Sequence, residues 1–399
     1  MLPLAWCCSV EHATNNPHER RKIFDEPPSL LRCTSAFDAK LGGTGLSVRK
    51  RTVSKSQSPS FSQDATKPFS SREKPPHQTN QQRSEPKVPQ GRFASPAETA
   101  VIFDWDDSLF PTTHIQERLG LNMTRKLADQ KSTLPWPKRA VISAEVTACE
   151  RSAIELLRTA HSRGHVFIVT LARPGWVQMV CCNFFPKFGA TIRELGIRII
   201  YAQENAEIAE LEKESAGNSQ TKKEKQPDQT GQFASALEAR KRLSLVKAHA
   251  MYKELRWFYS QYEGQTWKNV IAIGDSCFEM YGLLIAASSY LQGEQVSDNI
   301  KHVYDTLQQD LWERSENGSV LKVRVKCCWL VDGPDLAELK LQLNRLSKWL
   351  GKIVEVDASL TLEFPYCVDE NNVALVESVL AGQSPVSELS RLHEQFVVG

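Results

Sequence analysis

Three short apolar segments that each end in polar residues constrain the fold of this chain more than any other feature. The segments are 99–104, 165–170 and 268–274. Between them, apolar residues recur with helical spacing, as in 145–162 and 235–261. Strands that alternate with helices are typical of a parallel sheet, because each crossover helix returns the chain to the same edge. The sequence therefore predicts an α/β fold.

Further segments extend this pattern. Strands are predicted at 197–201 and 321–329, and helices at 175–185, 186–195, from about 278 and at 335–350. Together these segments predict a Rossmann-like, three-layer α/β/α arrangement around a mainly parallel sheet.

Two acidic residues follow the first apolar segment. Asp104 and Asp106 are two positions apart, so their side chains point to the same face at the tip of the strand. Two close carboxylates repel each other, and a bound divalent cation normally relieves that repulsion. Acidic residues after a strand are also ordinary turn formers, and this pattern alone does not decide between the two interpretations.

Polar residues follow the later segments in a fixed order. Thr170 ends the second segment, and Gly274-Asp275 ends the third. Glu279 lies four residues beyond Asp275, and Lys247 lies on the helical segment before the third strand. The carboxyl ends of parallel strands meet at one edge of a sheet, which is where α/β proteins form their active sites.

This ordered set resembles the haloacid dehalogenase superfamily, whose pattern is strand–Asp-x-Asp, strand–Thr, a Lys, and strand–Gly-Asp-x-x-x-Asp/Glu. The resemblance covers roughly 97–290, and the strings FDWDDS, VTLA and GDSCFE are most similar to little-characterised protist members. The chain departs from the pattern at Asp107, where Gly is usual, and at Ser108, where Thr is usual.

The resemblance implies a phosphomonoester hydrolase. Asp104 would attack phosphorus to form an aspartyl-phosphate, and Asp106 would protonate the leaving alcohol and then activate water. Thr170 would donate a hydrogen bond to a phosphoryl oxygen, and a Lys would stabilise the charged intermediate.

The resemblance also implies Mg²⁺ as cofactor. The ion would be held by Asp104, Asp275 and the backbone carbonyl of Asp106, with Glu279 as a ligand or close behind the ligands.

The identity of the catalytic Lys is open from the residues alone. The candidates before the third acidic strand are Lys241, Lys247, Lys253 and Lys268. Lys268 begins that strand, and seven residues at about 3.3 Å each place it roughly 23 Å from Asp275, at the wrong edge. Lys247 lies beside apolar helix positions and can reach inward, although an exposed helical Lys is an equal alternative.

Residues around the motifs predict how open the site is. An insertion at 111–140 and a polar loop at about 207–232 offer no globular lid, so we expect a minimal cap and a phosphate carried by a protein or another bulky molecule. The alternative is a small cap that suffices for metabolites. The candidate substrate or cap residues are Trp105, Asp107, Arg118, Arg125 and Trp136.

Composition divides the chain into three regions. Residues 1–95 carry 15 Lys and Arg against 8 Asp and Glu and are rich in Ser and Pro, which predicts a disordered basic tail. Residues 96–365 form the predicted α/β domain, and 366–399 a C-terminal extension. Residues 96–399 carry 34 basic against 39 acidic residues, which argues against broad nucleic-acid binding.

The sequence also bounds the compartment. No apolar run is long enough to span a membrane, and the ten cysteines contain no Cys-x-x-Cys, which predicts a soluble protein with reduced thiols. We expect a cytoplasmic protein, with nuclear entry open because Arg49–Ser54 is basic. A second functional hypothesis is a catalytically inactive module that keeps the fold and binds partner proteins. Asp107, where Gly is usual, and the open identity of the catalytic Lys motivate it.

Overall fold

The computed structural model describes residues 92–130, 136–203, 229–297, 313–316 and 319–389. Most of the tail predicted for 1–95 lies outside the described residues, and so does most of the loop predicted for 207–232.

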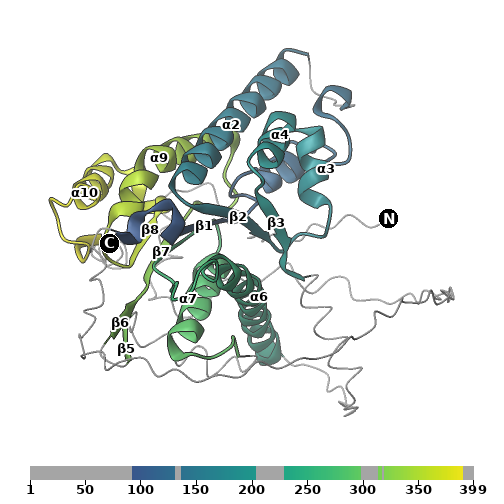
Figure 1. Cartoon of the computed structure of the whole chain (residues 1–399). Coiled ribbons are helices and arrows are strands. Elements are labelled where there is room, and N and C mark those ends of the chain that lie inside the picture. The colour runs from purple at the N-terminus through teal and green to yellow at the C-terminus, as the bar shows by residue number, and fades with distance from the viewer. Residues whose placement is uncertain (1–91, 131–135, 204–228, 298–312, 317–318, 390–399) are drawn as a thin grey trace, which may run out of the picture. The chain divides into compact units, whose positions relative to one another are not determined.

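A six-stranded sheet with all strands parallel forms the centre of the domain (Figure 1), and its order is β3–β2–β1–β4–β7–β8. The strands are β1 (Thr99–Phe103), β2 (His165–Thr170), β3 (Arg198–Tyr201), β4 (Asn269–Gly274), β7 (Arg324–Trp329) and β8 (Leu360–Glu363). The chain builds outward from β1 to β3 and then returns to the other side of β1, so β1 and β4 flank the topological switch point. The predicted parallel α/β fold is confirmed.

Helices cover both faces of the sheet (Figure 1). They are α2 (Trp136–Arg163), α3 (Trp176–Asn183), α4 (Pro186–Glu194), α6 (Gln229–Phe258), α7 (Cys277–Gln292), α9 (Leu336–Glu355) and α10 (Glu370–Leu380). Successive residues of β1 alternate between the two cores: Val101 and Phe103 join the core under α2 and α9, whereas Ile102 joins the core under α6 and α7. This alternation is why the central strands are apolar throughout.

Several element boundaries differ from the sequence prediction. The alternating run 321–329 is divided at Val323: β6 (Ser319–Lys322) pairs with β5 (Glu313–Glu316) in a separate antiparallel hairpin, and only β7 joins the main sheet. The edge strand β8 was not predicted from the sequence. Helix α2 begins at Trp136, so the last five residues of the insertion predicted at 111–140 are helical.

Both ends of the described region pack on the domain. Phe93 is buried under the guanidinium of Arg324, 4.1 Å from its ring centroid, although the tail was predicted to reach position 95. In the predicted C-terminal extension, Val376 and Leu380 of α10 belong to the main core.

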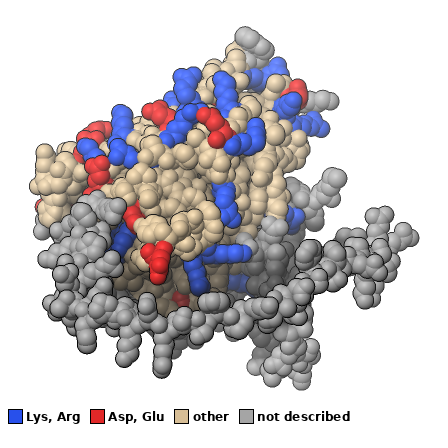
Figure 2. All heavy atoms as spheres, viewed as in Figure 1, with Lys and Arg blue, Asp and Glu red and all other residues tan. Residues whose placement is uncertain are grey.

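Charged side chains of both signs are interspersed on the surface over α2 and its neighbours (Figure 2). Two ion pairs tie these helices together: Arg158–Glu194 at 2.8 Å and Arg163–Glu355 at 3.2 Å. Among the described helices, none has the length and apolar character that a membrane crossing requires.

Candidate active site

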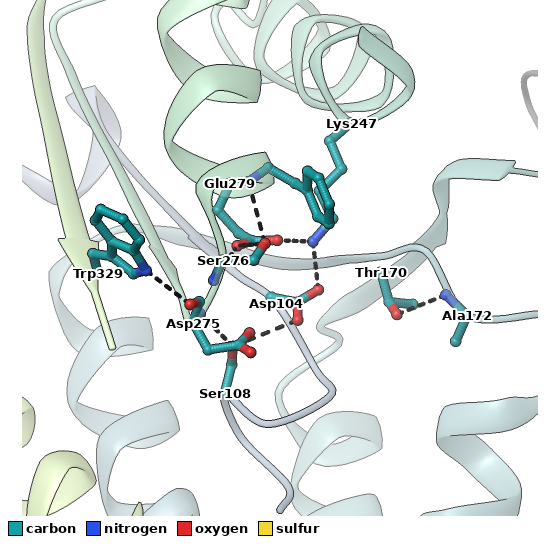
Figure 3. A network of polar contacts seen from close by, with 10 residues as sticks. Asp104, Ser108, Thr170, Ala172, Lys247, Asp275, Ser276, Glu279 and Trp329 are labelled. Atoms are coloured by element: carbon teal, nitrogen blue, oxygen red, sulfur yellow. Dashed lines mark hydrogen bonds and ion pairs between the residues drawn. The ribbon is translucent and has the colours of Figure 1, made fainter. Parts of the chain in front are cut away.

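Asp104 and Asp275 lie side by side because they follow the neighbouring strands β1 and β4 (Figure 3). The N–H of Asp104 donates to the carbonyl of Ile273 (2.9 Å), which carries the strand pairing one residue further. The hydroxyl of Ser108 lies between the two carboxylates, 2.9 Å from Asp275 Oδ1 and 3.5 Å from Asp104 Oδ2. It also accepts the N–H of Asp275 (3.0 Å). Ser108 therefore supplies the link that a Thr could make at this position.

Lys247 reaches this pair of carboxylates from α6. Its Nζ donates to Asp104 Oδ1 at 2.7 Å and also pairs with Glu279, and its side chain is buried. Gly282 of α7 allows the approach, since a Cβ there would lie 3.1 Å from Lys247 Cβ. Of the four Lys candidates, Lys247 is thus the one in contact with Asp104. Lys268 precedes β4 at the opposite edge of the sheet, as strand length predicts.

Glu279 has both carboxylate oxygens committed to donors from the protein. Oε1 receives Lys247, and Oε2 receives the backbone N–H (3.0 Å) and the hydroxyl (2.6 Å) of Ser276. These contacts form a capping box at the start of α7. Gly274 is required beside them, because a Cβ there would lie 2.2 Å from Glu279 Cγ. Glu279 is therefore the partner of Lys247, and its predicted place as a metal ligand or close behind the ligands stays a prediction.

Asp106 and Asp107 have separate environments although they are adjacent. Asp106 Oδ1 accepts the indole N–H of Trp176 (2.9 Å) and the hydroxyl of Thr112. Asp107 has a left-handed backbone conformation with φ of 56°, and its carboxylate accepts the N–H of Thr113 (3.0 Å) and the hydroxyl of the same residue. Left-handed backbone favours Gly, which explains why Gly is usual at this position in the family that the sequence resembles.

Thr170 ends β2 on the other side of Asp104 from Asp275 (Figure 3). Its Oγ1 accepts the N–H of Ala172 at 3.0 Å. A hydroxyl that accepts a bond in this way keeps its hydrogen for donation to another group. Thr170 is therefore oriented as a donor at the sheet edge.

Burial dominates the electrostatics of this edge. It raises the pKa of Asp104 to about 7 against the opposing charge of Lys247, and it raises the pKa of Asp275 well above its ordinary value. Burial alone would lower the pKa of Lys247, but the carboxylates of Asp104 and Glu279 outweigh it and raise that pKa. Among the described residues of this edge, the ammonium of Lys247 thus faces several buried carboxylates, an arrangement that favours an added cation.

Two contributors to this edge were missed by sequence reasoning. The indole N–H of Trp329, at the end of β7, donates to the carbonyl of Asp275 (2.8 Å). Burial is the main cause of the raised pKa values of Asp107 and Asp275, and the charge of Asp332, just beyond β7, adds a smaller effect in the same direction. An acid three residues past the alternating run 321–329 was the available signal for Asp332.

The other four predicted substrate and cap residues differ in where they lie. Trp105 is fully buried in the core, stacked on Phe110 with ring centroids 5.7 Å apart, so its interpretation as a substrate contact is wrong for this structure. Arg118 is exposed, and its guanidinium donates to the carbonyl of Gly333 (3.0 Å). Arg125 is exposed in the insertion, and the side chain of Trp136 lies outside the described residues.

Comparisons with family models, curated proteins and solved structures find no match to this chain. The fold alone, with its parallel sheet and switch point, is compatible with Rossmann-like and haloacid dehalogenase-like proteins. Within the described ranges, no three His, Cys, Asp or Glu side chains are arranged as a group that could hold a metal ion.

Proposed function

We propose that this chain is a phosphomonoester hydrolase of the haloacid dehalogenase type, which acts through an aspartyl-phosphate on Asp104. The observation that carries the proposal is the 2.7 Å contact between Lys247 Nζ and Asp104 Oδ1 at the edge that also holds Asp275 and Thr170. Four segments far apart in the sequence supply these side chains. Their order along the chain matches the family pattern that the sequence resembles.

The first step forms a bond between a carboxylate oxygen of Asp104 and phosphorus while the bond from phosphorus to the leaving oxygen breaks. Asp106, whose pKa is raised by burial, gives its proton to that leaving oxygen. Lys247 and the Thr170 hydroxyl would stabilise the added negative charge. In the second step, Asp106 takes a proton from water as the water oxygen attacks phosphorus, and Asp104 is released with inorganic phosphate.

The donor set at this edge suits Mg²⁺, which prefers oxygen ligands. The carboxylates of Asp104 and Asp275 and the backbone carbonyl of Asp106 would hold the ion. Burial raises the pKa of both carboxylates, and an adjacent cation would favour their ionised forms. The bound ion would supply neutralisation of charge on the phosphoryl oxygens.

The proposed substrate is a phosphate carried by a protein or another bulky molecule. Within 111–130, Ile115, Leu121 and Met123 are buried in the main core, so this part of the insertion packs on the domain instead of forming a separate lid. Where no separate lid encloses the reacting group, a bulky substrate can supply its own cover. Screening phosphopeptides beside a panel of small phosphates tests this, and strong selectivity for one small phosphate with phosphopeptides untouched would contradict it.

The test of the activity itself uses 4-nitrophenyl phosphate. The purified full chain should release phosphate with Mg²⁺, lose activity on chelation, and lose it in Asp104→Asn, which keeps the shape but not the nucleophile. Equal turnover in the wild type and this variant would rule out Asp104 as the nucleophile.

A second candidate is an inactive module that keeps the fold and binds partner proteins. The observation in its favour is that the described residues hold no preformed metal-binding group. Beryllofluoride, which mimics the aspartyl-phosphate, separates the candidates. Binding that requires Mg²⁺ supports the hydrolase, and no binding under any condition supports the module.

A further inference from the structure

A polar stripe runs along α6 from Lys247 toward the start of that helix. Arg240, Ser244 and Lys247 are spaced by four and then three residues, so they share one face of the helix. Lys247 already lies against Asp104. With a rise of about 1.5 Å per residue, Ser244 lies about 4.5 Å and Arg240 about 10 Å from Lys247 along the helix axis.

Arg240 and Ser244, the two members of the stripe nearer the start of α6, each have a buried polar atom that makes no hydrogen bond to the described part of the chain. These atoms are Nη2 of Arg240 and Oγ of Ser244, and the Ser244 side chain is almost fully buried. A helical Ser normally donates to the carbonyl four residues earlier, which this one does not do. Leaving a cationic donor and a hydroxyl unpaired is costly, so such groups point to a ligand.

The packing of α6 on α7 shows where Arg240 lies relative to the carboxyl edge of the sheet. Both helices run from the carboxyl edge of the sheet to its amino edge: α7 follows β4 directly, and Tyr259, just after α6, donates to the carbonyl of Asn269 at the start of β4 (3.1 Å). Figure 1 shows the two helices side by side.

Gly282 of α7 is level with Lys247, because a Cβ there would meet Lys247 Cβ at 3.1 Å. Arg240 is seven residues before Lys247, and Cys277, the first residue of α7, is five residues before Gly282, so Arg240 lies near the start of α7, just after Asp275. In agreement, the charge of Arg240 acts on the Cys277 thiol, opposing the larger effect of burial, which raises the pKa of that thiol to about 11.

We propose that Arg240 and Ser244 bind a second anionic group of the substrate. The substrate would then be a phosphomonoester with another phosphate or carboxylate on the order of 10 Å from the phosphoryl group that reacts at Asp104. This inference rests on the proposed function for the identity of the first group. A guanidinium suits either anion, because its paired N–H groups match carboxylate and phosphate oxygens.

The test compares three probes that share a six-carbon chain: hexyl phosphate, hexane-1,6-diyl bisphosphate and 6-phosphonooxyhexanoate. Calorimetric titration with Mg²⁺ uses the full chain carrying Asp104→Asn, so that no probe is consumed. Both probes with a second anion should bind at least about tenfold more tightly than hexyl phosphate. The larger gain distinguishes phosphate from carboxylate as the second group.

Arg240→Ala should reduce the affinity ratio between the probes with and without a second anion to about one. Ser244→Ala should reduce this ratio in part. Arg242→Ala is the matched control, because it removes the same charge from an exposed position about 200° around the helix. Neither Arg240→Ala nor Ser244→Ala should lower the thermal midpoint, because each removes a buried polar atom without a partner, Nη2 of Arg240 or Oγ of Ser244. A residue with a purely structural role would instead lower the thermal midpoint when replaced and leave the gain in affinity unchanged.

The outcomes separate this inference from the proposed function. If Arg240→Ala leaves the gain unchanged, or if Arg242→Ala abolishes it equally, the second site is wrong whatever the activity. If the wild type hydrolyses no phosphoester but binds the bisphosphate in a way that depends on Arg240, the anion site holds and the hydrolase proposal fails. If no probe binds, the second site is wrong, and turnover of 4-nitrophenyl phosphate decides the hydrolase proposal separately.

Discussion

Asp107 combines two features that can be separated by substitution at a single residue. Its φ of 56° is a conformation that Gly adopts readily and Ala only at a cost in free energy, and its carboxylate binds Thr113. Asp107→Gly and Asp107→Ala lose the same side-chain contacts, so their difference reports the backbone. We expect the Gly variant to be more stable by about 0.5–1 kcal/mol in chemical denaturation. An Ala variant of equal or greater stability would contradict the left-handed conformation.

Lys247 differs from the other lysines of α6 in what its ammonium contacts. Lys247→Ala should lower turnover of an aryl phosphate by about 100-fold or more, because it removes a charge contact to the reacting carboxylate. Lys253→Ala, which removes an exposed lysine of the same helix, should change turnover less than about twofold. Circular dichroism checks that both variants fold. Similar losses in the two variants would refute the role given to Lys247.

At the scale of elements, the contact between α6 and α7 depends on a helical glycine. A Cβ at Gly282 would lie 3.1 Å from Lys247 Cβ and 3.4 Å from the backbone N of Ala248, so in Gly282→Ala the atoms of α6 must shift by a few tenths of an ångström. At Gly351 of α9 the added Cβ meets only the flexible guanidinium of Arg163. Both changes gain helix propensity, about 1 kcal/mol each.

We therefore expect Gly282→Ala to be less stable than Gly351→Ala by about 1–2 kcal/mol and to lose turnover, because Lys247 moves with α6. Urea denaturation and phosphate release measure the two effects. Equal stability and full activity in Gly282→Ala would mean that the helices can adjust without displacing Lys247.

The elements show which parts of this fold a sequence can predict. The central strands were predictable because burial on both faces makes them continuous apolar runs, and the acids at their ends follow from that register. The division at Val323 was not, since the alternation continues through it while the partner strand changes. β8 has only four residues, too few for a periodic signal.

The sequence predicted the site to a similar extent as the fold. Asp104, Asp275 and Thr170 come together because their strands are neighbours, which topology dictates. Sequence could not show that Glu279 is occupied by a capping box, or that Arg240 and Ser244 have unpaired atoms, because these facts depend on side-chain rotamers across two helices.

At the scale of the whole molecule, a buried lysine in β7 should influence how the free energy of unfolding varies with pH. Lys326, within β7, is fully buried and donates to the carbonyls of Ile353 (2.7 Å) and Val354 (3.0 Å) in the last turn of α9. Burial lowers the pKa of Lys326 to about 7, and the nearby charge of Arg324 adds to this effect. The ordinary pKa of Lys, near 10.5, applies to the unfolded chain.

Between these two pKa values the unfolded chain binds the proton and the folded chain does not, so the contribution of Lys326 to stability rises with pH from about 7 to 10. Below about pH 7 the full cost of burying the charge remains. The free energy of unfolding of the wild type, relative to Lys326→Met, should therefore rise by about 1 kcal/mol per pH unit between pH 7.5 and 9. Denaturant titrations across this range measure it.

Lys352→Met is the control. It removes an exposed charge from the end of α9, the helix whose carbonyls bind Lys326, and its pH profile should follow that of the wild type. Parallel pH profiles for wild type and Lys326→Met would mean that Lys326 stays charged in the fold, held by the two helix carbonyls.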